Sequence, residues 1–237
     1  MQKNTLTIAI PLFNEAQSIS YLKKKLLLSL EKIQFETKIL FVDDGSSDNT
    51  FELLNTEFSE IKNYKILQHN LNLNLGGCIK TLIDNCETEF IVFLDSDCTF
   101  DPFYISEMVT LIDDGVDIIN GSPYHPNGDV DGVKKVRLFI SNGANYIYRL
   151  LLNSKIYTYT SIFKLYRTSV IKNISLESYG FVAVTELFVK SILNGATVIE
   201  LPCILKIRKF GDSKINILNS TINHIKFMIK LLINKVN

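Results

Sequence analysis

The sequence has few of the residues that mark a secreted, zinc-binding or membrane-spanning protein. Its four cysteines form no C-x-x-C pair and have no histidine at ligand spacing, so we expect buried, reduced thiols. The three histidines, His69, His125 and His224, are scattered and form no nucleophile or metal group. Residues 1–5 lead into a strand without an apolar signal region, and no run of about 18 uncharged apolar residues follows. We therefore expect a cytoplasmic protein, soluble or peripheral on the inner face of the cell membrane.

The charge is balanced in total but is unevenly distributed along the chain. Residues 201–237 carry seven Lys or Arg against Asp212 alone, which gives this end a net charge of +6 and the first 200 residues −6. Ile, Leu, Phe and Met fill the gaps between these basic residues, a composition that suits a lipid headgroup layer better than nucleic acid. We expect peripheral membrane contact and no nucleic-acid partner.

The hydrophobic pattern predicts an α/β fold with a mostly parallel central sheet. A chain of 237 residues that is 46% hydrophobic can bury one substantial core. Strands rich in Ile, Val and Phe alternate with helical patterns, which is typical of a sheet covered on both faces. The strands are predicted near residues 5–10, 38–43, 64–68, 90–95 and 116–120, and a helix is predicted over 18–32.

The pattern changes after residue 120. Residues 121–129 form a polar, turn-rich loop, which is typical of a functional lid. A helix is predicted over 134–152, with strands over 159–167 and 197–207. The last segment has an apolar stripe at helical spacing, which predicts an amphipathic helix that either packs on the domain or contacts a membrane. The stripe consists of Leu218, Ile222, Ile225, Ile229, Leu232 and Val236.

Two carboxylates one residue apart follow an apolar run at Asp95-Ser96-Asp97. Alternate side chains of a strand point the same way, so both carboxylates can face a site beyond the sheet edge. There they could bind a hard divalent cation and leave positions open for phosphate oxygens. Taken alone, the motif is as well explained by a polar exit from a strand.

A second acidic segment, residues 43–48, follows an earlier strand in the same way. Its carboxylates could accept hydrogen bonds from a nucleobase or from ribose hydroxyls. The first strand ends at Pro11-Leu12-Phe13-Asn14-Glu15, which adds an aromatic ring and another acceptor. An ordinary turn would also explain the Asp, Gly and Ser content of residues 43–48.

These segments, in this order, resemble the family 2 glycosyltransferases of the GT-A fold, and more closely their polyprenyl-phosphate sugar synthase branch. The resemblance runs from about residue 5 to residue 216. The matching segments are residues 11–16, 42–48, 74–77, 95–97, 117–122, Arg137 with Ser141, 160–164, 180–181, Glu186 and 208–214. It implies a GT-A domain over 1–214, with a nucleotide-sugar half at 1–120 and an acceptor half at 121–214, followed by a basic amphipathic helix at 215–237.

The resemblance also implies roles for individual residues on the donor side. Pro11, Phe13, Glu15, Asp43 and Asp44 look like the nucleotide pocket. Asp95 and Asp97 look like the ligands of Mg²⁺ or Mn²⁺ on the diphosphate. The cation neutralises the charge that develops on the departing diphosphate.

On the acceptor side, Arg137, Ser141, Arg208 and Lys214 look like residues that face a phosphate, because Arg and Lys bring permanent charge. A solvated helix surface, a helix hydroxyl and a basic turn would also explain these four residues. Glu186 lies in an apolar run, where a carboxylate needs a partner or has a raised pKa. It could be the base for a hydroxyl acceptor, or it could hold an arginine in place.

Three residues depart from the pattern of this branch. Pro123 stands where an arginine is common, Thr158 where an aspartate is usual, and Thr99 where a glutamine is common. The departures weaken the acceptor half and leave the nucleotide and metal half intact. The donor is therefore better supported than the acceptor.

The leading hypothesis is an inverting, metal-dependent glycosyltransferase that moves a hexose from a GDP- or UDP-sugar to a polyprenyl phosphate. An ionised phosphate acceptor needs orientation and charge compensation more than a base. The alternative acceptor is a hydroxyl of a glycan or glycolipid, with Glu186 as base. A non-catalytic nucleotide-sugar-binding or scaffold protein is a third hypothesis. The base, the sugar and the oligomeric state stay open.

Overall fold

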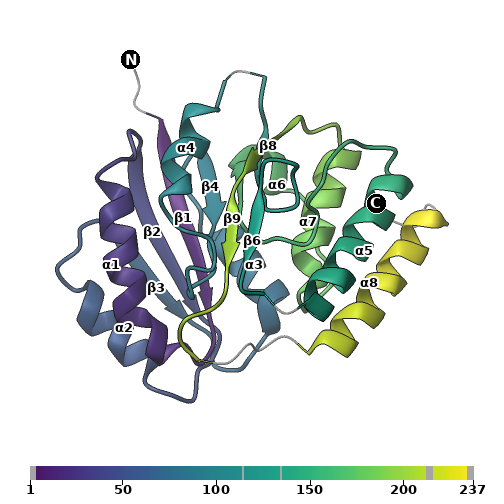
Figure 1. Cartoon of the computed structure of the whole chain (residues 1–237). Coiled ribbons are helices and arrows are strands. Elements are labelled where there is room, and N and C mark those ends of the chain that lie inside the picture. The colour runs from purple at the N-terminus through teal and green to yellow at the C-terminus, as the bar shows by residue number, and fades with distance from the viewer. Residues whose placement is uncertain (1–3, 114, 134, 212–215, 234–237) are drawn as a thin grey trace.

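The computed structural model describes residues 4–113, 115–133, 135–211 and 216–233, which build a seven-stranded sheet with helices on both faces (Figure 1). The strand order is β3-β2-β1-β4-β7-β5-β8, and a second, smaller sheet pairs β6 with β9. The strands are β1 (Thr5–Leu12), β2 (Glu36–Asp43), β3 (Tyr64–Gln68), β4 (Phe90–Phe93), β5 (Ile118–Ser122), β6 (Asp129–Asp131), β7 (Lys164–Arg167), β8 (Val198–Pro202) and β9 (Ile204–Lys206). The helices are η1 (Ala16–Ser18), α1 (Ile19–Leu30), α2 (Thr50–Phe58), α3 (Asn74–Asp84), α4 (Tyr104–Thr110), α5 (Lys135–Leu151), α6 (Thr168–Ile171), α7 (Val182–Leu193) and α8 (Ile217–Leu232).

The predicted α/β fold with a mostly parallel sheet is confirmed. Strands β1, β2, β3 and β4 pair in parallel, and so do β5 and β8, whereas β7 lies antiparallel between β4 and β5. The strand expected over 159–167 begins only at Lys164. Upstream of it, the backbone N–H groups of Tyr159 and Thr160 donate to Asn145 Oδ1 of α5, at 2.8 and 3.2 Å, and not to a neighbouring strand.

The prediction of a single strand over 197–207 is wrong, because the chain passes from the large sheet to the small one at Cys203. β8 extends the large sheet beside β5, whereas β9 pairs with β6. Between them, Cys203 donates its N–H to Ser122 O at 3.3 Å and accepts from Asp129 N at 3.1 Å. The backbone of one residue therefore bridges the end of the large sheet and the start of the small one.

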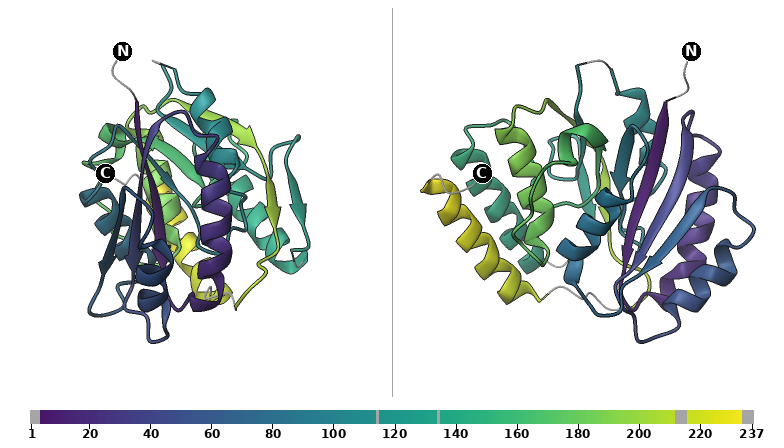
Figure 2. Two further views of the ribbon diagram at one scale, coloured as in Figure 1. Left: turned by 90° about the vertical axis from the view of Figure 1, so that its left-hand side faces the viewer. Right: turned by 180° about the vertical axis from the view of Figure 1, so that it is seen from behind.

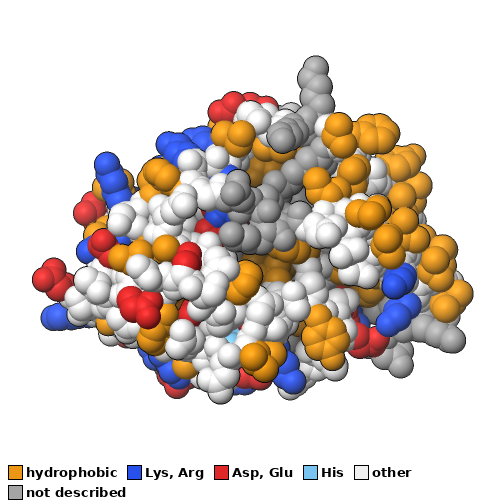
Figure 3. Space-filling model, turned by 90° about the horizontal axis from the view of Figure 1, so that it is seen from below, with side chains coloured by type: hydrophobic (Ala, Val, Ile, Leu, Met, Phe, Trp, Pro, Cys, Tyr) orange, Lys and Arg blue, Asp and Glu red, His pale blue; other side chains and the backbone are white. Residues whose placement is uncertain are grey.

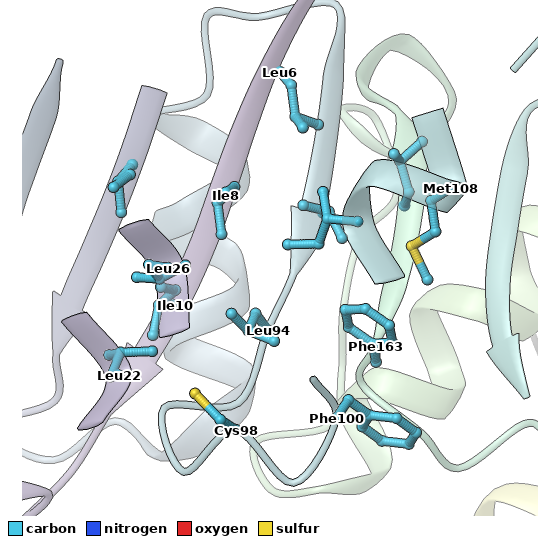
Figure 4. Close-up of a cluster of buried hydrophobic side chains, with 14 of the residues drawn as sticks. Leu6, Ile8, Ile10, Leu22, Leu26, Leu94, Cys98, Phe100, Met108 and Phe163 are labelled. Carbon is cyan, nitrogen blue, oxygen red and sulfur yellow. The ribbon is translucent and has the colours of Figure 1, made fainter. Parts of the chain in front are cut away.

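Hydrophobic clusters on the two faces of the sheet form the core. Leu6, Ile8 and Ile10 of β1 belong to the cluster on the face covered by α1, α2 and α4, and Figure 4 shows Ile10 beside Leu22 and Leu26 of α1. Ala9 points to the opposite face, which α3 and α7 cover. Figure 2 shows these helix layers from the side and from behind. A strand buried on both faces reads as a continuous apolar run, which explains the sequence pattern.

The C-terminal helix α8 forms as predicted, but it does not turn its apolar stripe toward the protein. Leu218, Ile225 and Leu232 are 69%, 50% and 66% exposed, and the last member of the predicted stripe, Val236, lies outside the described residues. Phe227 and Met228 bury the opposite face of α8, which packs against α5 and α7 (Figure 1). Within the described part of the chain, every helix is too short or too polar to cross a membrane.

We propose that residues 1–214 form one domain, as the sequence analysis expects. One sheet passes through both predicted halves, since β7 of the acceptor half lies between β4 and β5 of the nucleotide half. Residues 212–215 are not described, and helix α8 follows them. This helix contacts α5 and α7, and the described residues after 211 add no strand to the sheet. This supports the proposed boundary at residue 215.

Candidate active site

The predicted donor residues meet at the edge where β1, β2 and β4 end. These strands are parallel neighbours, so their carboxyl ends share one edge of the sheet. From β1 the chain continues to β2 and β3 on one side, and β4 lies on the other. Such a reversal in strand order forms a crevice in which α/β proteins bind their ligands. Figure 3 looks onto the molecule from this edge.

Asp43 is fully buried at the end of β2 and is held on both sides. Its Oδ1 accepts hydrogen bonds from the hydroxyl and the N–H of Ser46, and its Oδ2 accepts one from Gln68 Nε2 at 2.9 Å. Asn14, which follows β1, accepts from Ser47 N with its side-chain oxygen at 2.8 Å. The two predicted nucleotide segments are therefore linked directly.

Asp44 is buried and belongs to a different hydrogen-bonded group. Its Oδ1 lies 2.6 Å from His69 Nδ1 and accepts from Leu73 N at 2.8 Å. Asp44, His69 and Cys78 place potential ligand atoms within 4.8 Å of one another. However, His69 Nε2 is 2.9 Å from Thr81 Oγ1, and burial raises the pKa of the Cys78 thiol, which disfavours a metal-binding thiolate. We therefore propose that Asp44 supports the nucleotide pocket from behind.

The Asp95-Ser96-Asp97 segment follows β4 with the alternation that the sequence predicts. Asp95 and Asp97 are partly exposed, whereas Ser96 and Cys98 are buried. Asp97 Oδ1 accepts from Thr99 N at 3.0 Å, and its Oδ2 lies 3.7 Å from Arg208 Nε. Two partly exposed carboxylates are the oxygen donors that Mg²⁺ and Mn²⁺ prefer, so the residues fit such a cation.

Arg208 is brought to this edge of the sheet from near the other end of the chain. It follows β9, and its Nη2 forms an ion pair with Glu15 Oε2, the oxygen that also accepts from Ser18 Oγ at 2.8 Å. The predicted nucleotide residue Glu15 and the predicted phosphate-facing residue Arg208 are therefore direct partners. Sequence spacing gave no signal for this pairing, since 193 residues separate the two.

Part of the predicted acceptor half is described by the structure. Ser141 is on α5, with its Oγ 3.0 Å from Thr160 Oγ1. Arg137 lies on the same helix, but its side chain is outside the described part of the chain, and so is all of Lys214. Thr158, a departure from the branch pattern, is buried with its Oγ1 2.7 Å from Ser122 Oγ.

Glu200, which the sequence pattern did not single out, holds residues 157–158 of this half. Its carboxylate accepts from Tyr157 N at 2.9 Å, from Thr158 N at 3.1 Å and from Asn120 Nδ2 at 3.0 Å. The only available signal was a lone acidic residue in the apolar strand Val198–Pro202. A carboxylate in such a run commonly caps backbone donors.

Glu186 is buried in α7 and has partners on both carboxylate oxygens. Oε1 accepts from Glu177 N at 2.9 Å and lies 3.2 Å from Lys190 Nζ, and Oε2 accepts from Ser178 N at 2.8 Å. The side chains of Glu186 and Lys190 are 1% and 4% exposed. The sequence left open that Glu186 holds an arginine in place. Its charged partner is instead Lys190. We propose a structural role for Glu186, because it holds the 177–178 loop.

This fold and this site define a nucleotide-binding α/β protein of the GT-A type, with carboxylates gathered at the switch point of the sheet. The model of the glycosyl transferase family 2 matches residues 7–175, and the chain belongs to this family. It is a glycosyltransferase with the GT-A fold.

Named relatives and solved structures agree with this assignment. Polyprenol monophosphomannose synthase of Mycolicibacterium smegmatis is 28% identical over 221 residues, which cover 90% of this chain and 82% of that protein. Dolichol-phosphate mannosyltransferase of Pyrococcus furiosus is 27% identical over 212 residues and is matched over 59% of its length. The structure of glucosyl-3-phosphoglycerate synthase from Mycobacterium tuberculosis, with Mn²⁺, UDP and product, superimposes with a TM-score of 0.69 at 12% identity, covering 99% of this chain and 80% of that one.

Proposed function

We propose that this enzyme transfers a hexose from a nucleoside diphosphate sugar to a polyprenyl phosphate, with inversion and with Mg²⁺ or Mn²⁺. The observation that carries the proposal is the meeting of Asp43, Asp95, Asp97 and Arg208 at one edge of the sheet. Both relatives described above are named for transfer to a polyprenol or dolichol phosphate. The solved relative with UDP and Mn²⁺ has the same fold.

On the donor side, Glu15 would face the nucleoside, and the buried Asp43 would support this pocket by holding Ser46 and Gln68. Asp95 and Asp97 would hold the cation. A cation bound there supplies positive charge to the departing diphosphate, so the leaving group needs no proton. The Asp97 side chain is held in place because Thr99 N donates to its Oδ1, while its Oδ2 lies 3.7 Å from Arg208 Nε. Pro11, near the end of β1, and Phe13, just after the strand, would complete the wall of this pocket.

On the acceptor side, a phosphate is favoured over a hydroxyl. A hydroxyl acceptor needs a base, and the sequence offered Glu186 for that task. Both oxygens of Glu186 are engaged by Lys190 and by the backbone of the 177–178 loop. An ionised phosphate attacks without a base and needs positive charge beside it, which Arg208 supplies and which we also assign to Arg137 and Lys214.

Helices α5 and α8 give the enzyme a surface that suits a lipid-borne acceptor. On α5, Phe139, Tyr146 and Leu150 are 81%, 62% and 62% exposed, beside the exposed stripe of α8. Apolar side chains gather on the right of Figure 3, on the side of these two helices, with basic side chains among them. Apolar and basic side chains together are typical of helices that lie in a membrane interface. We propose peripheral binding to the inner face of the cell membrane through this surface.

Thermal unfolding with GDP- and UDP-sugars tests the donor half of the proposal. One nucleotide should raise the melting temperature in the presence of Mn²⁺ and not with EDTA, because a ligand that binds only the folded state stabilises it. Asp97→Asn should abolish the rise in melting temperature that depends on Mn²⁺, and it should lower kcat by about a hundredfold or more. A donor that stabilises wild type and Asp97→Asn equally would contradict the metal assignment.

A transfer assay with matched lipids tests the acceptor half. We expect sugar transfer to a polyprenyl phosphate and none to the corresponding polyprenol, which lacks the phosphate. Ile225→Asp together with Ile229→Asp should abolish flotation with anionic vesicles while donor binding is retained. Transfer to a glycan hydroxyl, with no transfer to the lipid phosphate, would overturn the acceptor assignment.

A further inference from the structure

We propose that Lys164 is a positioning residue for the acceptor. Its buried amine holds residues 157–161, here called the clamped segment, in a shape that places the hydroxyl of Thr160 beside that of Ser141. The two hydroxyls would then bind the acceptor phosphate together. This inference rests on the proposed function and adds two residues to its acceptor side, Lys164 and Thr160.

The clamped segment leads to the edge of the sheet that carries Asp95 and Asp97. Strand β7 begins at Lys164 and runs antiparallel to β4, with Lys164 opposite Phe93. Neighbouring antiparallel strands run in opposite directions, so the residues before Lys164 leave the sheet on the side where Asp95 follows β4. An acceptor bound by the clamped segment would therefore lie close to the diphosphate of the donor.

Side chains of other elements hold the backbone of the clamped segment in place of a neighbouring strand. Glu200 of β8 accepts from the N–H groups of residues 157 and 158, and Asn145 of α5 accepts from those of residues 159 and 160. Asn120 of β5 donates to the carbonyl of residue 158 at 2.7 Å. The backbone groups of an irregular segment are thus satisfied one by one, which fixes a single shape.

The side chains that hold the segment do so at a cost in stability. Asn120 Oδ1 and Asn145 Nδ2 are buried without a hydrogen-bond partner among the residues that the structure describes. A buried polar atom without a partner costs free energy. The other amide atom of each side chain is bonded to the clamped segment. A shape that is held at such a cost favours a role in binding over a purely structural one.

Lys164 holds the two carbonyls of the clamped segment that lie nearest to β7. It is fully buried, and its Nζ donates to Ser161 O and, at 3.4 Å, to Tyr159 O. The ring of Phe188 on α7 lies 4.7 Å from the same atom. Burial lowers the pKa of the Lys164 ammonium to about 7, against the opposing effect of the Glu200 carboxylate. A neutral amine still has two N–H donors, one for each carbonyl, so Lys164 can hold the segment in either protonation state.

The two threonines of the clamped segment differ in what their hydroxyls contact. Thr158 is buried, and its Oγ1 lies 2.7 Å from Ser122 Oγ inside the protein. Thr160 is partly exposed, and its Oγ1 lies 3.0 Å from Ser141 Oγ on α5, which is partly exposed as well. A hydroxyl can donate to a phosphate oxygen, so this pair can bind two oxygens of one phosphate. The hydroxyl of Thr158 is already used within the fold.

Steady-state kinetics with a polyprenyl phosphate test the role of Lys164. Lys164→Met keeps a long, unbranched side chain and removes the N–H donors. We expect the acceptor KM to rise about tenfold, with kcat at saturating acceptor within about threefold of wild type, because one hydrogen-bonding group is lost. Donor binding with Mn²⁺, measured by calorimetry, should not change. An unchanged acceptor KM in a folded Lys164→Met enzyme would overturn the role of Lys164.

The matched control is Lys190→Met, which removes another buried lysine, one that holds Ser175 O and not the clamped segment. It should lower stability and leave the acceptor KM within about twofold of wild type. An equal rise in acceptor KM in both variants would show a general effect of lost stability and would overturn the proposal. Lys164→Gln, which keeps N–H donors at a shorter reach, gives the same comparison if Lys164→Met does not fold.

The two threonines give a second matched pair. Thr160→Val removes the partly exposed hydroxyl at nearly constant volume and should raise the acceptor KM about tenfold, whereas Thr160→Ser should restore it. Thr158→Val removes the hydroxyl that faces Ser122 and should leave the acceptor KM unchanged. Equal acceptor KM values for Thr160→Val and wild type would overturn the binding role of Thr160.

Hydrogen exchange tests the hold of Lys164 on the segment without any substrate. Amides of residues 157–160 should exchange about tenfold faster in Lys164→Met than in wild type, while those of α2 keep their rates. Unchanged exchange in the segment would overturn the hold itself. If wild type transfers no sugar to a lipid phosphate, the proposed function fails. If it does, and the Lys164 and Thr160 variants keep the wild-type acceptor KM, only this inference fails.

Discussion

Asp44 and His69 form a shielded pair in which Oδ1 and Nδ1 are 2.6 Å apart, and their side chains are only 3% and 11% exposed. The pair joins the loop after β2 to the loop after β3. Because Asp44 Oδ1 also accepts from Leu73 N at the start of α3, one carboxylate fixes three segments. Asp43, the adjacent residue, is thereby held at the end of β2.

Substitution of Asp44 should destabilise the fold itself. We expect Asp44→Ala to lower the free energy of unfolding by about 2 to 4 kcal/mol, because it leaves His69 and the Leu73 N–H without their acceptor. Urea unfolding followed by circular dichroism measures this. The control is Asp84→Ala on the exposed side of α3, which should change stability by about 0.5 kcal/mol or less. Equal stability of the two variants would contradict the structural role of Asp44.

Glu186 and Lys190 should behave as a coupled structural pair. Each single substitution, Glu186→Met or Lys190→Met, removes the opposite charge from a buried group and should cost about 3 kcal/mol. Lys190 then keeps Glu177 Oε1 at 3.6 Å and Ser175 O at 2.9 Å, and Glu186 keeps the N–H groups of residues 177 and 178. The double variant should be more stable than the sum of the single losses predicts, as measured by a double-mutant cycle in urea. Turnover per folded molecule should stay within about tenfold of wild type in Glu186→Gln. A large loss of turnover in Glu186→Gln with unchanged stability would instead indicate that Glu186 acts as the base.

Two helical glycines make a matched test of backbone packing. A Cβ on Gly76 in α3 would come within 2.3 Å of Ser178 O and 2.9 Å of Tyr179 Cα, both of them backbone atoms, whereas a Cβ on Gly143 in α5 meets nothing within 4 Å. Gly76→Ala should therefore destabilise by about 2 kcal/mol or more, through overpacking. Gly143→Ala should stabilise by about 0.5 to 1 kcal/mol, because alanine favours helix. Thermal melts of the two variants should shift in opposite directions.

The docking of α8 should weaken in mild acid. Burial lowers the pKa of His224 to about 4, and its Nδ1 lies 2.9 Å from the hydroxyl of Tyr148 on α5. In the unfolded chain the histidine pKa is near 6.5, so the unfolded state binds a proton at a pH where the folded state does not. The contribution of neutral His224 to the free energy of unfolding is therefore complete above pH 6.5 and is lost as the pH falls toward 4. Because the ring is only partly buried, we expect a loss of about 1 to 2 kcal/mol. Hydrogen exchange of α8 at pH 5 and pH 7 measures this, and His224→Gln should flatten the difference.

The gathering of carboxylates at one edge of the sheet could be predicted from sequence because each part is local. Asp43, Asp95 and Asp97 each follow an apolar strand directly, and parallel strands bring their carboxyl ends to one edge. The roles of Asp44 and Glu186 could not be predicted this way. Both depend on what lies against them, which is His69 for one and Lys190 with the 177–178 loop for the other.

The sequence by itself determined the α/β alternation, the family and the acidic edge, since these depend on short-range periodicity and on motifs in order. Only the tertiary structure decided two further points. It joined Arg208 to Glu15 across 193 residues, and it turned the apolar stripe of α8 outward, with Phe227 and Met228 against the core. The physical reason is the same for both. Periodicity shows that a helix has an apolar face, but it does not show which surface that face contacts. Charge shows that a residue needs a partner, but it does not identify the partner. Both depend on how segments far apart in the sequence pack against each other.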